Sequence, residues 1–352
     1  MKKDYKIIVI NAGSFSLKYS FFIGNNLIKE EKFDKLKNEK DYVFSLKRIF
    51  ENIKEFDFII HRVVHGGNLK NPCLINKKVK KEIKNFSEFA PLHNPIQLKL
   101  IEESQNLFKN KRQYAVFDSM FFYNLPEISK IYAIPLKITK KYGIRRYGFH
   151  GLSHSSISRN IKGKTITCHL GSGVSLSAII DGKPIDTSMG LTPLEGVMMG
   201  TRSGSIDPGI IFFLEKRGYN VEKILNEDSG LKGISSYKDF RDILKNMSIN
   251  KNCKIAYDLF VYSIVKCIGS YVSVMNGLDN LIFTSAIGEN VPKIREDICK
   301  YFSYINLNLD KINNNKNKGI ISSKYSKVKV LVKKSEEEKE ALNEVLKALN
   351  KK

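Results

Sequence analysis

The sequence predicts an α/β protein made of two related domains. Segments with the apolar pattern of strands alternate with segments of helical periodicity along the whole chain of 352 residues. A strand, a Gly/Ser turn and a second strand occur in succession twice, around Gly13 and around Gly171, which lie 158 positions apart (171 − 13). At the same offset, Gly24 corresponds to Gly182 in the next hairpin turn. The length also suits two cores better than one.

The first of these turns has the composition of a phosphate-binding corner. An apolar strand, 7–10, runs directly into it, and the second copy lies at 166–175. Backbone N–H groups and hydroxyls that converge in a tight turn, with an ammonium group nearby, suit a phosphate. An ordinary hairpin turn with surface hydroxyls is the alternative, and the repetition favours the binding role. The residues of this phosphate or metal corner are Asn11, Ser14, Ser16 and Lys18.

Two further strands are predicted in the first half of the chain. Residues 56–65 form a strand that leads into the pair Gly66-Gly67, and 114–117 form a shorter strand that ends at Asp118. Ligands of open α/β sheets bind at the carboxyl ends of strands. Asp118 is therefore a candidate site residue, with capping of the following helix as the alternative.

The second half is predicted to contain a long helix over 254–275, ended by Gly277. A strand at 281–284, a turn at 285–290 and a helix after Pro292 follow it. The helical spacing is carried by Ile255, Leu259, Ile264, Ile268, Val272 and Met275.

The chain ends in a predicted amphipathic helix. Ser335 and Glu338 have the spacing of a capping box. Its apolar stripe consists of Ala341, Leu342, Val345, Leu346 and Leu349. We expect a first domain of residues 1–120 joined by the final helix, 339–352, and a second domain of residues 121–338.

The formal net charge of +23 permits a nucleic-acid-binding function. The lysines, however, are spread along the chain, and no helix-turn-helix, zinc finger or RNA-binding aromatic motif is present. We therefore expect no nucleic-acid partner.

The cysteines and the apolar segments indicate the compartment. The five cysteines are far apart and form no Cys-x-x-Cys pair or Cys/His cluster, which argues against a zinc site and a disulfide framework. No uninterrupted apolar run approaches the ~20 residues that span a bilayer. The first apolar run ends at Ile10, too early for a signal peptide. We expect a cytoplasmic protein with no membrane partner.

Histidine and arginine mark further candidate sites. Six histidines in Gly- or Arg-rich segments favour anion handling over a core role, and their spacing does not suit zinc. Arg202 lies between two glycines, where a guanidinium reaches carboxylate or phosphoryl oxygens, with a structural ion pair as the alternative. The histidines are His61, His65, His93, His150, His154 and His169.

Several segments together resemble the acetate kinase family, of the acetate and sugar kinase, heat-shock chaperone and actin superfamily. Besides the first turn they are HRVVHGG (61–67), APLHNP (90–95), VFD (116–118), GIRRYGFHG (143–151), HLGSG (169–173), DTSMGLTPLEGVMMGTRSG (186–204), DFR (239–241) and IGEN (287–290). The resemblance implies a duplicated ribonuclease-H-like (actin-like ATPase) fold with mixed sheets flanked by helices. It also implies a homodimer and reversible transfer of the ATP γ-phosphoryl group to acetate, giving acetyl phosphate and ADP, with Mg²⁺ or Mn²⁺.

The resemblance also implies roles for individual residues. Asp118, His150 and Arg202 match the catalytic residues, and Asn11 matches a metal-site residue. Glu337 aligns best with the second metal-site residue, with its neighbour Glu338 left open. The acetate-binding residues implied are Arg62, Val64, Leu92 and Pro193. The nucleotide-binding residues implied are Ser14, Ser16, Lys18, His169, Leu170, Gly171, Ser172, Gly173, Asp239, Phe240, Arg241, Ala286, Ile287, Gly288, Glu289 and Asn290.

The ionisation of acetate affects the role expected for Asp118. A free carboxylic acid has a pKa near ~4 to 5, so acetate has no proton to remove at neutral pH. Although the family's aspartate is usually described as a proton donor or acceptor, we hypothesise that Asp118 orients Mg²⁺, directly or through water. Arg62, Arg202 and His150 would brace the phosphoryl oxygens.

The sequence departs from the family pattern at several positions, which bears on nucleotide affinity and metal geometry more than on reaction class. Propionate is the alternative substrate, and a nucleotide-binding regulator that has lost turnover is the alternative function. Trapping acetyl phosphate with hydroxylamine separates an enzyme from such a regulator. The departures are Phe15, Asn68, Phe122, Ser172, Ser205 and Ala286.

Overall fold

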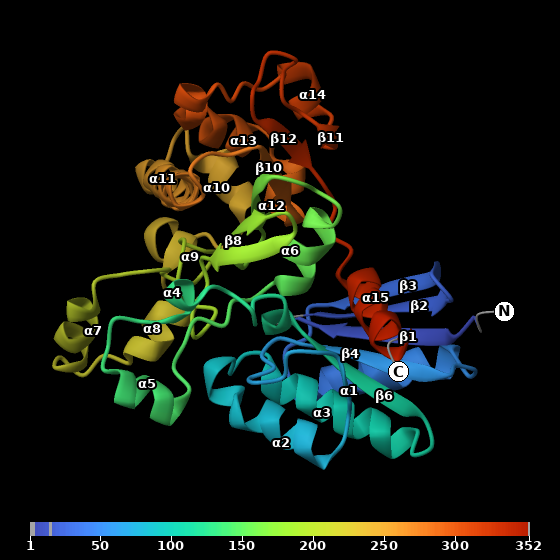
Figure 1. Cartoon of the computed structure of the whole chain (residues 1–352). Helices are drawn as coiled ribbons and strands as arrows, with labels where there is room; N and C mark the ends of the chain where they lie inside the picture. Colours follow the sequence, from blue (N-terminus) through green and yellow to red (C-terminus); the bar gives the residue numbers. More distant parts are fainter. Residues whose placement is uncertain (1–3, 14–15, 351–352) are drawn as a thin grey trace. The chain divides into compact units, whose positions relative to one another are not determined.

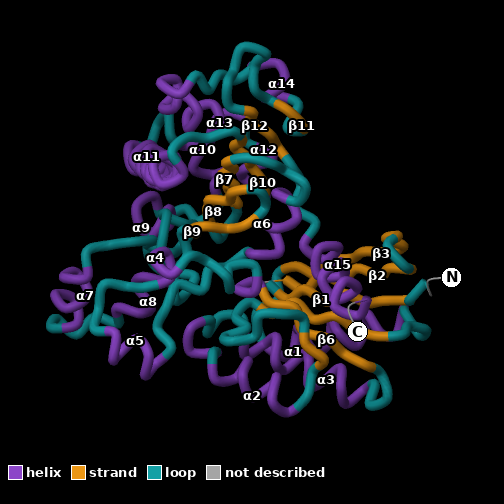
Figure 2. Tube along the Cα trace, viewed as in Figure 1, coloured by secondary structure: helices purple, strands orange, loops and turns teal. Residues whose placement is uncertain are grey.

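Two six-stranded mixed sheets, each flanked by helices, form the framework of the computed structural model, which describes residues 4–13 and 16–350 (Figures 1 and 2). The first sheet has the order β3-β2-β1-β4-β6-β5 and the second β11-β12-β10-β7-β8-β9. Their strands are β1 Lys6–Ala12, β2 Ser16–Ile23, β3 Asn26–Asp34, β4 Phe58–Val63, β5 Cys73–Leu74, β6 Arg112–Phe117, β7 Lys164–Leu170, β8 Val174–Ile180, β9 Lys183–Thr187, β10 Asn280–Thr284, β11 Gly319–Ile320 and β12 Lys329–Val332.

The two sheets have the same topology, which confirms the predicted duplication. Read from its other edge, the second sheet runs β9-β8-β7-β10-β12-β11, in one-to-one correspondence with the first. In each sheet the first three strands form an antiparallel meander, two strands add in parallel, and a short antiparallel strand closes the edge. The fold is the duplicated actin-like ATPase fold.

The first hairpin turns of the two repeats differ in length. Ala12 pairs with Leu17 across β1 and β2, so four positions separate the two paired residues. Leu170 pairs with Val174 across β7 and β8, so the second turn is one residue shorter.

This difference corrects the predicted correspondence of Gly24 with Gly182. Ile23 pairs with Asn26, so Gly24 is the first residue of its turn. In the second repeat Ile180 pairs with Lys183, so Asp181 is the first turn residue and Gly182 the second. The equal spacing of the glycines therefore conceals a shift of one residue.

Helices cover the sheets, and their bounds are as follows. The α-helices are α1 Glu39–Asn52, α2 Lys77–Asn85, α3 Asn94–Leu107, α4 Glu127–Lys130, α5 Leu136–Tyr142, α6 Gly151–Ser158, α7 Pro208–Glu215, α8 Val221–Glu227, α9 Gly230–Ser235, α10 Phe240–Asn246, α11 Lys251–Met275, α12 Ser285–Asn290, α13 Pro292–Cys299, α14 Lys311–Asn315 and α15 Glu337–Asn350. Short 3₁₀ turns are η1 Ser87–Phe89, η2 Asp118–Met120 and η3 Lys300–Ile305.

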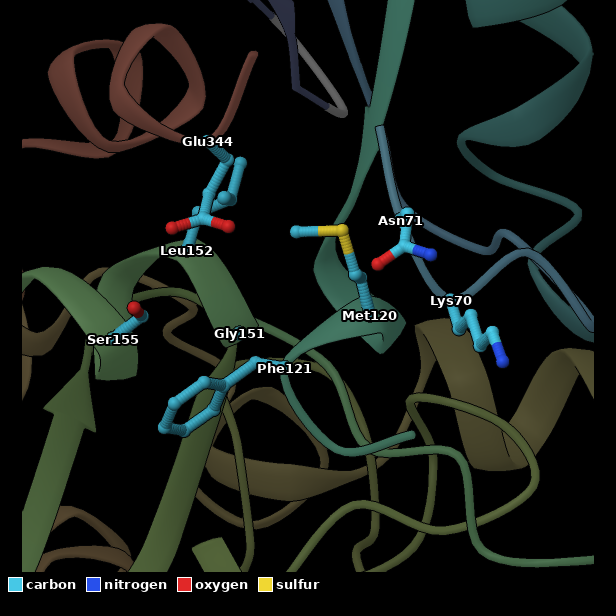
Figure 3. A pocket seen from close by; sticks show the side chains of 8 residues that line it. All are labelled: Lys70, Asn71, Met120, Phe121, Gly151, Leu152, Ser155 and Glu344. Carbon is cyan, nitrogen blue, oxygen red and sulfur yellow. The ribbon is translucent and has the colours of Figure 1, made fainter. Parts of the chain in front are cut away.

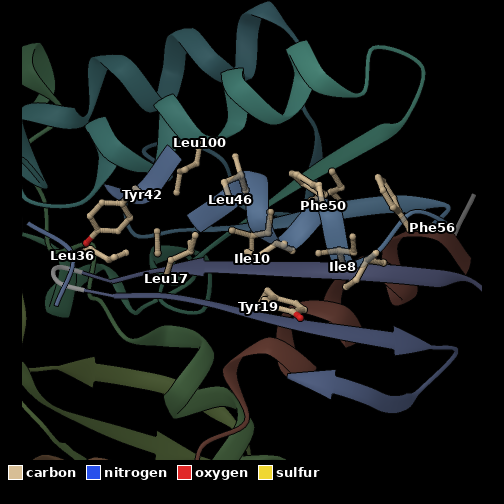
Figure 4. Packing of buried hydrophobic residues seen from close by; sticks show 14 residues of the cluster. Ile8, Ile10, Leu17, Tyr19, Leu36, Tyr42, Leu46, Phe50, Phe56 and Leu100 are labelled. Carbon is tan, nitrogen blue, oxygen red and sulfur yellow. The ribbon is translucent and has the colours of Figure 1, made fainter. Parts of the chain in front are cut away.

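Successive residues of β1 pack on opposite faces of the first sheet, because side chains alternate between the two faces along a strand. Ile8 and Ile10 face a cluster formed with α1 and α3, which Figure 4 shows between the strands and these helices. Ile7 and Val9 face a second cluster that includes α15. The predicted stripe of the last helix is thus used on the first sheet, with Ala341, Leu342 and Val345 fully buried and Leu346 and Leu349 partly buried.

The chain divides into two compact units. The first unit comprises 1–123, 149–156 and 336–352, and the second comprises 124–148 and 157–335. The segment 149–156 falls in the predicted second domain but clusters with the first unit, because Leu152 joins the core of the first sheet.

The long helix α11 matches the predicted helix with a shifted buried face. Ile264, Ile268, Val272 and Met275 are buried, but Ile255 and Leu259 are exposed, and Cys253, Ala256, Tyr257 and Phe260 are buried in their place. In the described residues, α11 is the one helix long and apolar enough to cross a membrane, by length and composition alone. Core helices pass the same test, and the apolar residues of α11 are interrupted by Lys254, Asp258 and Lys266.

One predicted turn is a helix. Residues 285–290 form α12, whose first residue, Ser285, has a positive φ of 68°. Glu289 accepts a hydrogen bond from the backbone N–H of Ser285 at 2.8 Å and so caps the helix from within. This self-capping explains why a short, glycine-containing segment is helical.

Candidate active site

A largely buried arginine is the centre of the first unit's site. Arg62 donates from Nε to Oδ1 of Asp118 at 3.0 Å and from Nη2 to Oδ2 at 2.7 Å. Its Nη1 donates to Oδ1 of Asn11 at 2.8 Å and lies 2.6 Å from Oε2 of Glu337. The side chains of Arg62 and Asp118 are 11% and 1% exposed. The guanidinium is therefore held on both edges by the predicted catalytic and metal-site residues.

A second charged pair adjoins this centre. Lys18 Nζ lies 3.0 Å from Oε2 of Glu338 and 3.1 Å from Oε2 of Glu30. Asn11 Nδ2 donates to Oε1 of Glu338 at 2.7 Å and to Oε2 of Glu337 at 3.2 Å. Both glutamates thus contact Asn11. Of these two glutamates, only Glu337 has a described ion pair with Arg62.

Strand register brings these residues together. Asn11 on β1 lies beside Arg62 on the parallel strand β4 and opposite Lys18 on the antiparallel strand β2. Asp118 follows β6, the next parallel neighbour of β4. Parallel strands end at one edge of a sheet, where open α/β sheets bind ligands. The first turn of α15 then supplies Glu337 and Glu338.

The electrostatics of the centre favour charged side chains. Burial opposes the charge of Arg62, but Asp118 and Glu337 more than offset it and raise the pKa of Arg62. Burial likewise opposes ionisation of Glu338, yet the charge of Lys18 and hydrogen bonds from Asn11 and Lys18 lower the pKa of Glu338. Burial lowers the pKa of Lys18, but Glu338 overcomes this and the net shift is upward.

Carboxylates outnumber cations here. Asp118, Glu337, Glu338 and Glu30 surround Arg62 and Lys18, which leaves two negative charges in excess (four minus two). No group of three or more His, Cys, Asp or Glu side chains forms a ready metal cage within the described ranges. The donor set is one of carboxylate and amide oxygens, the ligands that Mg²⁺ prefers.

Two polar residues that the sequence analysis missed fix the backbone beside the centre. Gln97 Nε2 donates to the carbonyl oxygen of Ala12, and its Oε1 accepts from the N–H of Val64, both at 2.9 Å. Asn94 accepts from the N–H of His65 and donates to its carbonyl oxygen, both at 3.0 Å. The available signal was the presence of these two polar residues on the sheet-facing stripe of an otherwise amphipathic helix.

Three of the predicted anion-handling histidines are core residues. His61 is buried between Gln113 and Ser104, with hydrogen bonds of 2.9 and 3.2 Å, and burial lowers the pKa of His61 to about 4. His65 and His154 are fully buried. The anion-handling prediction is wrong for His61, because a neutral buried imidazole carries no charge for an anion.

His150 lies beside the Asp118 segment. It has a positive φ of 53°, an uncommon conformation that is often found at functional sites. A Cβ on the next residue, Gly151, would overlap with the carbonyl oxygen of Asp118, so only glycine allows this approach. The backbone directly after His150 therefore packs against the backbone of Asp118, so the two predicted catalytic residues belong to segments in close contact.

A cavity of about 160 Å³ borders the same contact (Figure 3). None of its lining residues belongs to the predicted site. They are Lys70, Asn71, Met120, Phe121, Gly151, Leu152, Ser155 and Glu344.

The predicted acetate contacts are divided between the units. In the first unit Val64, two residues after Arg62, is buried, and Leu92 is 46% exposed in the loop before α3. In the second unit the carbonyl oxygen of Pro193 accepts a hydrogen bond of 2.7 Å from Nη1 of Arg202. Burial lowers the pKa of Arg202 to about 10.

The second unit gathers most of the predicted nucleotide-binding residues around the turn between β7 and β8. The N–H of Gly200 donates to the carbonyl oxygen of Ser172 at 3.3 Å. On the other side, a Cβ on Gly171 would lie 2.7 Å from Oγ of Ser285 in α12. The turn from His169 to Gly173 is therefore flanked by α12, with Ala286, Ile287, Gly288, Glu289 and Asn290, and by the loop that holds Arg202.

The DFR segment has a mixed role. Phe240 is buried and packs against Tyr257 and Phe260, so its ring belongs to the core. Asp239 caps α10 and pairs with Arg241 at 2.6 Å on the surface. Of the remaining predicted residues, Ser16 begins β2, and Ser14 lies outside the described residues, as does Phe15.

The other departures have structural partners. Asn68 donates to Glu82 from its backbone N–H at 3.1 Å and from Nδ2 at 3.0 Å. Phe122 packs in the core against His154. Ser205 Oγ accepts from the N–H of Gly196 at 3.1 Å.

Comparisons with known proteins show the family to which the chain is similar. The model of a family described as the Acetokinase family matches residues 28–342. An acetate kinase from Carboxydothermus hydrogenoformans is 39% identical over 384 residues, covering 95% of this chain and 96% of that protein. The crystal structure of Porphyromonas gingivalis acetate kinase superposes with a TM-score of 0.87 at 32% identity, covering 98% of this chain and 100% of that one. A propionate kinase from Francisella tularensis superposes with a TM-score of 0.86 at 34% identity, covering 97% and 98%.

Proposed function

This chain belongs to the acetokinase family, and from that premise we propose that it is an acetate kinase that transfers the γ-phosphoryl group of ATP reversibly to acetate, giving acetyl phosphate and ADP. The observation that carries the proposal furthest is the Arg62 centre. A guanidinium bound on one edge by Asp118 presents its other edge to a single carboxylate, that of Glu337.

Acetate binds to Nη1 of Arg62 in this proposal, in exchange for Glu337. Both ligands are carboxylates, and a guanidinium binds either by charge-assisted hydrogen bonds. Val64 is buried two residues after Arg62 in the chain and supplies an apolar contact for the methyl group, with Leu92 and Pro193 assigned to the same substrate by the family resemblance. Release of Glu337 from Arg62 frees its carboxylate for another cation.

Magnesium fits the residues around Asn11. The two negative charges in excess match a divalent cation, and carboxylate and amide oxygens are its preferred ligands. Asn11 and Glu337 would hold the ion, with water completing its coordination. When bound, the ion supplies charge neutralisation for the phosphates of ATP. Glu338 stays paired with Lys18, which positions that ammonium for the nucleotide.

Asp118 positions Arg62 in this structure, since both of its carboxylate oxygens bind the guanidinium. A positioning role requires no proton transfer, which agrees with the fact that acetate has no proton to remove at neutral pH. The expectation that Asp118 orients Mg²⁺ stays a prediction. His150 and Arg202 brace the transferred group, because in-line phosphoryl transfer depends on positioning and charge neutralisation more than on covalent chemistry.

The nucleotide binds to the second unit in this proposal. The glycine turn 171–173 offers backbone N–H groups, which suit phosphate oxygens. The Asp239–Arg241 pair is exposed and available to the adenosine. The methyl group of Ala286 lies at the start of α12, where the family usually has glycine.

A homodimer and a cytoplasmic location complete the proposal. None of the residues of α7 is buried, and Phe212 and Phe213 are 61% and 53% exposed, which suits contact with a second copy. All five cysteines are free thiols, as expected in a reducing compartment. Light scattering on the purified chain tests the dimer.

A substrate panel tests the function. Acetate, propionate and butyrate are each supplied with ATP and Mg²⁺, and the acyl phosphate is trapped with hydroxylamine. Acetate should give the highest kcat/KM, and propionate should follow within about 10- to 200-fold, because one methylene changes discrimination only modestly. Nucleotide binding without trapped product would favour the regulator, and a preference for propionate would reassign the substrate.

A further inference from the structure

We propose that Glu195 is a positioning residue for Arg202, acting through a brace formed with Tyr132 and Arg146. The proposal rests on the proposed function and adds a role that the family resemblance did not assign. All the residues concerned lie in the second unit.

The brace is built around the two carboxylate oxygens of Glu195. Oε1 accepts a hydrogen bond of 2.7 Å from Nη2 of Arg146, and Oε2 accepts one from the hydroxyl of Tyr132. The same hydroxyl accepts from the N–H of Leu191 at 2.9 Å. Glu195 therefore closes a ring of contacts between its own loop and two earlier segments of the chain.

Arg146 holds the beginning of the same loop. Its Nη1 donates to the carbonyl oxygen of Thr187 at 3.1 Å, and the N–H of the adjacent Tyr147 donates to the carbonyl oxygen of Gly190 at 2.9 Å. Its Nε donates to the carbonyl oxygen of Ser129 at 3.2 Å. One guanidinium thus joins the loop at 187–196 to the segment that carries Tyr132.

Packing leaves little freedom at this point. A Cβ on Gly190 would overlap both with Oε2 of Glu195 and with the hydroxyl of Tyr132. Burial and the charge of Glu195 raise the pKa of Tyr132, so the hydroxyl stays protonated and donates to the carboxylate. The brace is a closely packed polar network in which each member restricts the others.

The loop held by the brace orients Arg202. Nη1 of Arg202 donates to the carbonyl oxygen of Pro193, which lies two residues before Glu195. The segment after Arg202 is tied to the same loop, because the N–H of Ser205 donates to the carbonyl oxygen of Gly196 at 2.8 Å. The position of the Pro193 carbonyl therefore sets the direction of the Arg202 guanidinium.

Glu195→Gln and Tyr132→Phe test the brace, with Glu222→Gln at an exposed position as the matched control. Glu195→Gln should lower kcat by about 10- to 100-fold with little change in the KM for ATP, because small misplacements of a catalytic group have effects of that size. Tyr132→Phe, which removes one hydroxyl, should lower kcat by about 3- to 10-fold. Glu222→Gln should have the same kcat and the same KM for ATP as the unaltered chain.

Non-additivity separates positioning from a general loss of structure. In an Arg202→Ala background, Glu195→Gln should lower kcat no further, because its effect passes through the missing guanidinium. A folded Glu195→Gln variant with normal kcat, or fully additive losses in the double variant, would overturn the proposal.

Hydrogen exchange supplies a readout that does not depend on activity. Amides of 187–205 should exchange faster in Tyr132→Phe and Glu195→Gln than in Glu222→Gln, and equal exchange would contradict the brace. If the unaltered chain forms no acyl phosphate, the proposed function fails. The hydrogen-exchange comparison still decides whether the brace holds the loop.

Discussion

Arg62 binds both carboxylate oxygens of Asp118 through two parallel hydrogen bonds, from Nε at 3.0 Å and from Nη2 at 2.7 Å. A bidentate pair fixes the plane of the guanidinium as well as its position. The remaining nitrogen, Nη1, is thereby directed at Asn11 and Glu337. Asp118 therefore determines which edge of Arg62 is left for a second carboxylate.

Asp118→Asn should lower kcat by roughly 10²–10³, the range seen when one preorganised electrostatic contact is lost. The amide keeps the shape but loses the charge that aligns Arg62. The trapped acyl phosphate measures the rate, and Asp34→Asn, at an exposed ion pair on β3, is the matched control. Near-normal turnover in Asp118→Asn would rule out a positioning role.

Gly151→Ala should lower activity by about 10-fold or more, since the added methyl displaces the backbone of Asp118. Gly269→Ala in α11 is the control, because a Cβ there meets nothing within 4 Å. That control should be stabilised by about 0.5–1 kcal/mol, because alanine favours a helix over glycine. Equal activity of the two variants would show that the contact does not set the geometry of Asp118.

Glu337→Gln should raise the magnesium concentration needed for half-maximal rate by about 10-fold, within the range for weakened metal sites. Glu338→Gln should change this requirement less, because Glu338 pairs with Lys18. Titrating Mg²⁺ at fixed ATP and acetate compares the two isosteric variants directly. A larger effect in Glu338→Gln would reverse the assignment of the metal-site residue.

His61 should make the protein less stable in mild acid. The ordinary pKa of His is near 6.5, and burial lowers the pKa of His61 to about 4 in the folded state. Between these values the unfolded chain binds a proton that the folded chain does not, so stability falls as pH decreases from about 6.5 to about 4. The shift corresponds to about 3 kcal/mol in total.

Urea unfolding of the unaltered chain and of His61→Asn measures this effect. The free energy of unfolding of the unaltered chain should drop more between pH 7 and pH 4.5 than that of the variant. If the free energies of unfolding of the two proteins decrease in parallel, titratable groups other than His61 dominate the loss of stability in acid.

The strands and their edge residues could be predicted because the signals are local. An apolar strand followed by a polar residue at its carboxyl end identified Asn11 and Asp118 without knowledge of the register, whereas Arg62 was implied by the family resemblance alone. The equivalence of Gly24 and Gly182 was wrong because a one-residue difference in turn length is invisible in the spacing of glycines.

Tertiary context accounts for the other differences. α12 is helical because Glu289 caps its own first turn, a contact that no propensity reveals. His61 lies in the core because Gln113 and Ser104 satisfy it, and both residues come from distant segments. Asn94 and Gln97 were missed because their partners are backbone groups at the end of β1 and just after β4, which are distant in the sequence.

The helix α15 covers one face of the first sheet and delivers Glu337 and Glu338 to its edge. During synthesis on the ribosome, the strands of that sheet emerge long before this helix does. Until α15 leaves the exit tunnel, the face lined by Ile7, Val9 and Ile60 lacks the cover of Ala341, Leu342 and Val345, and Arg62 has no glutamate at Nη1. A polypeptide lacking α15 should therefore expose apolar surface on this sheet and leave Nη1 of Arg62 without its ion pair, so one helix serves both the core and the charged centre.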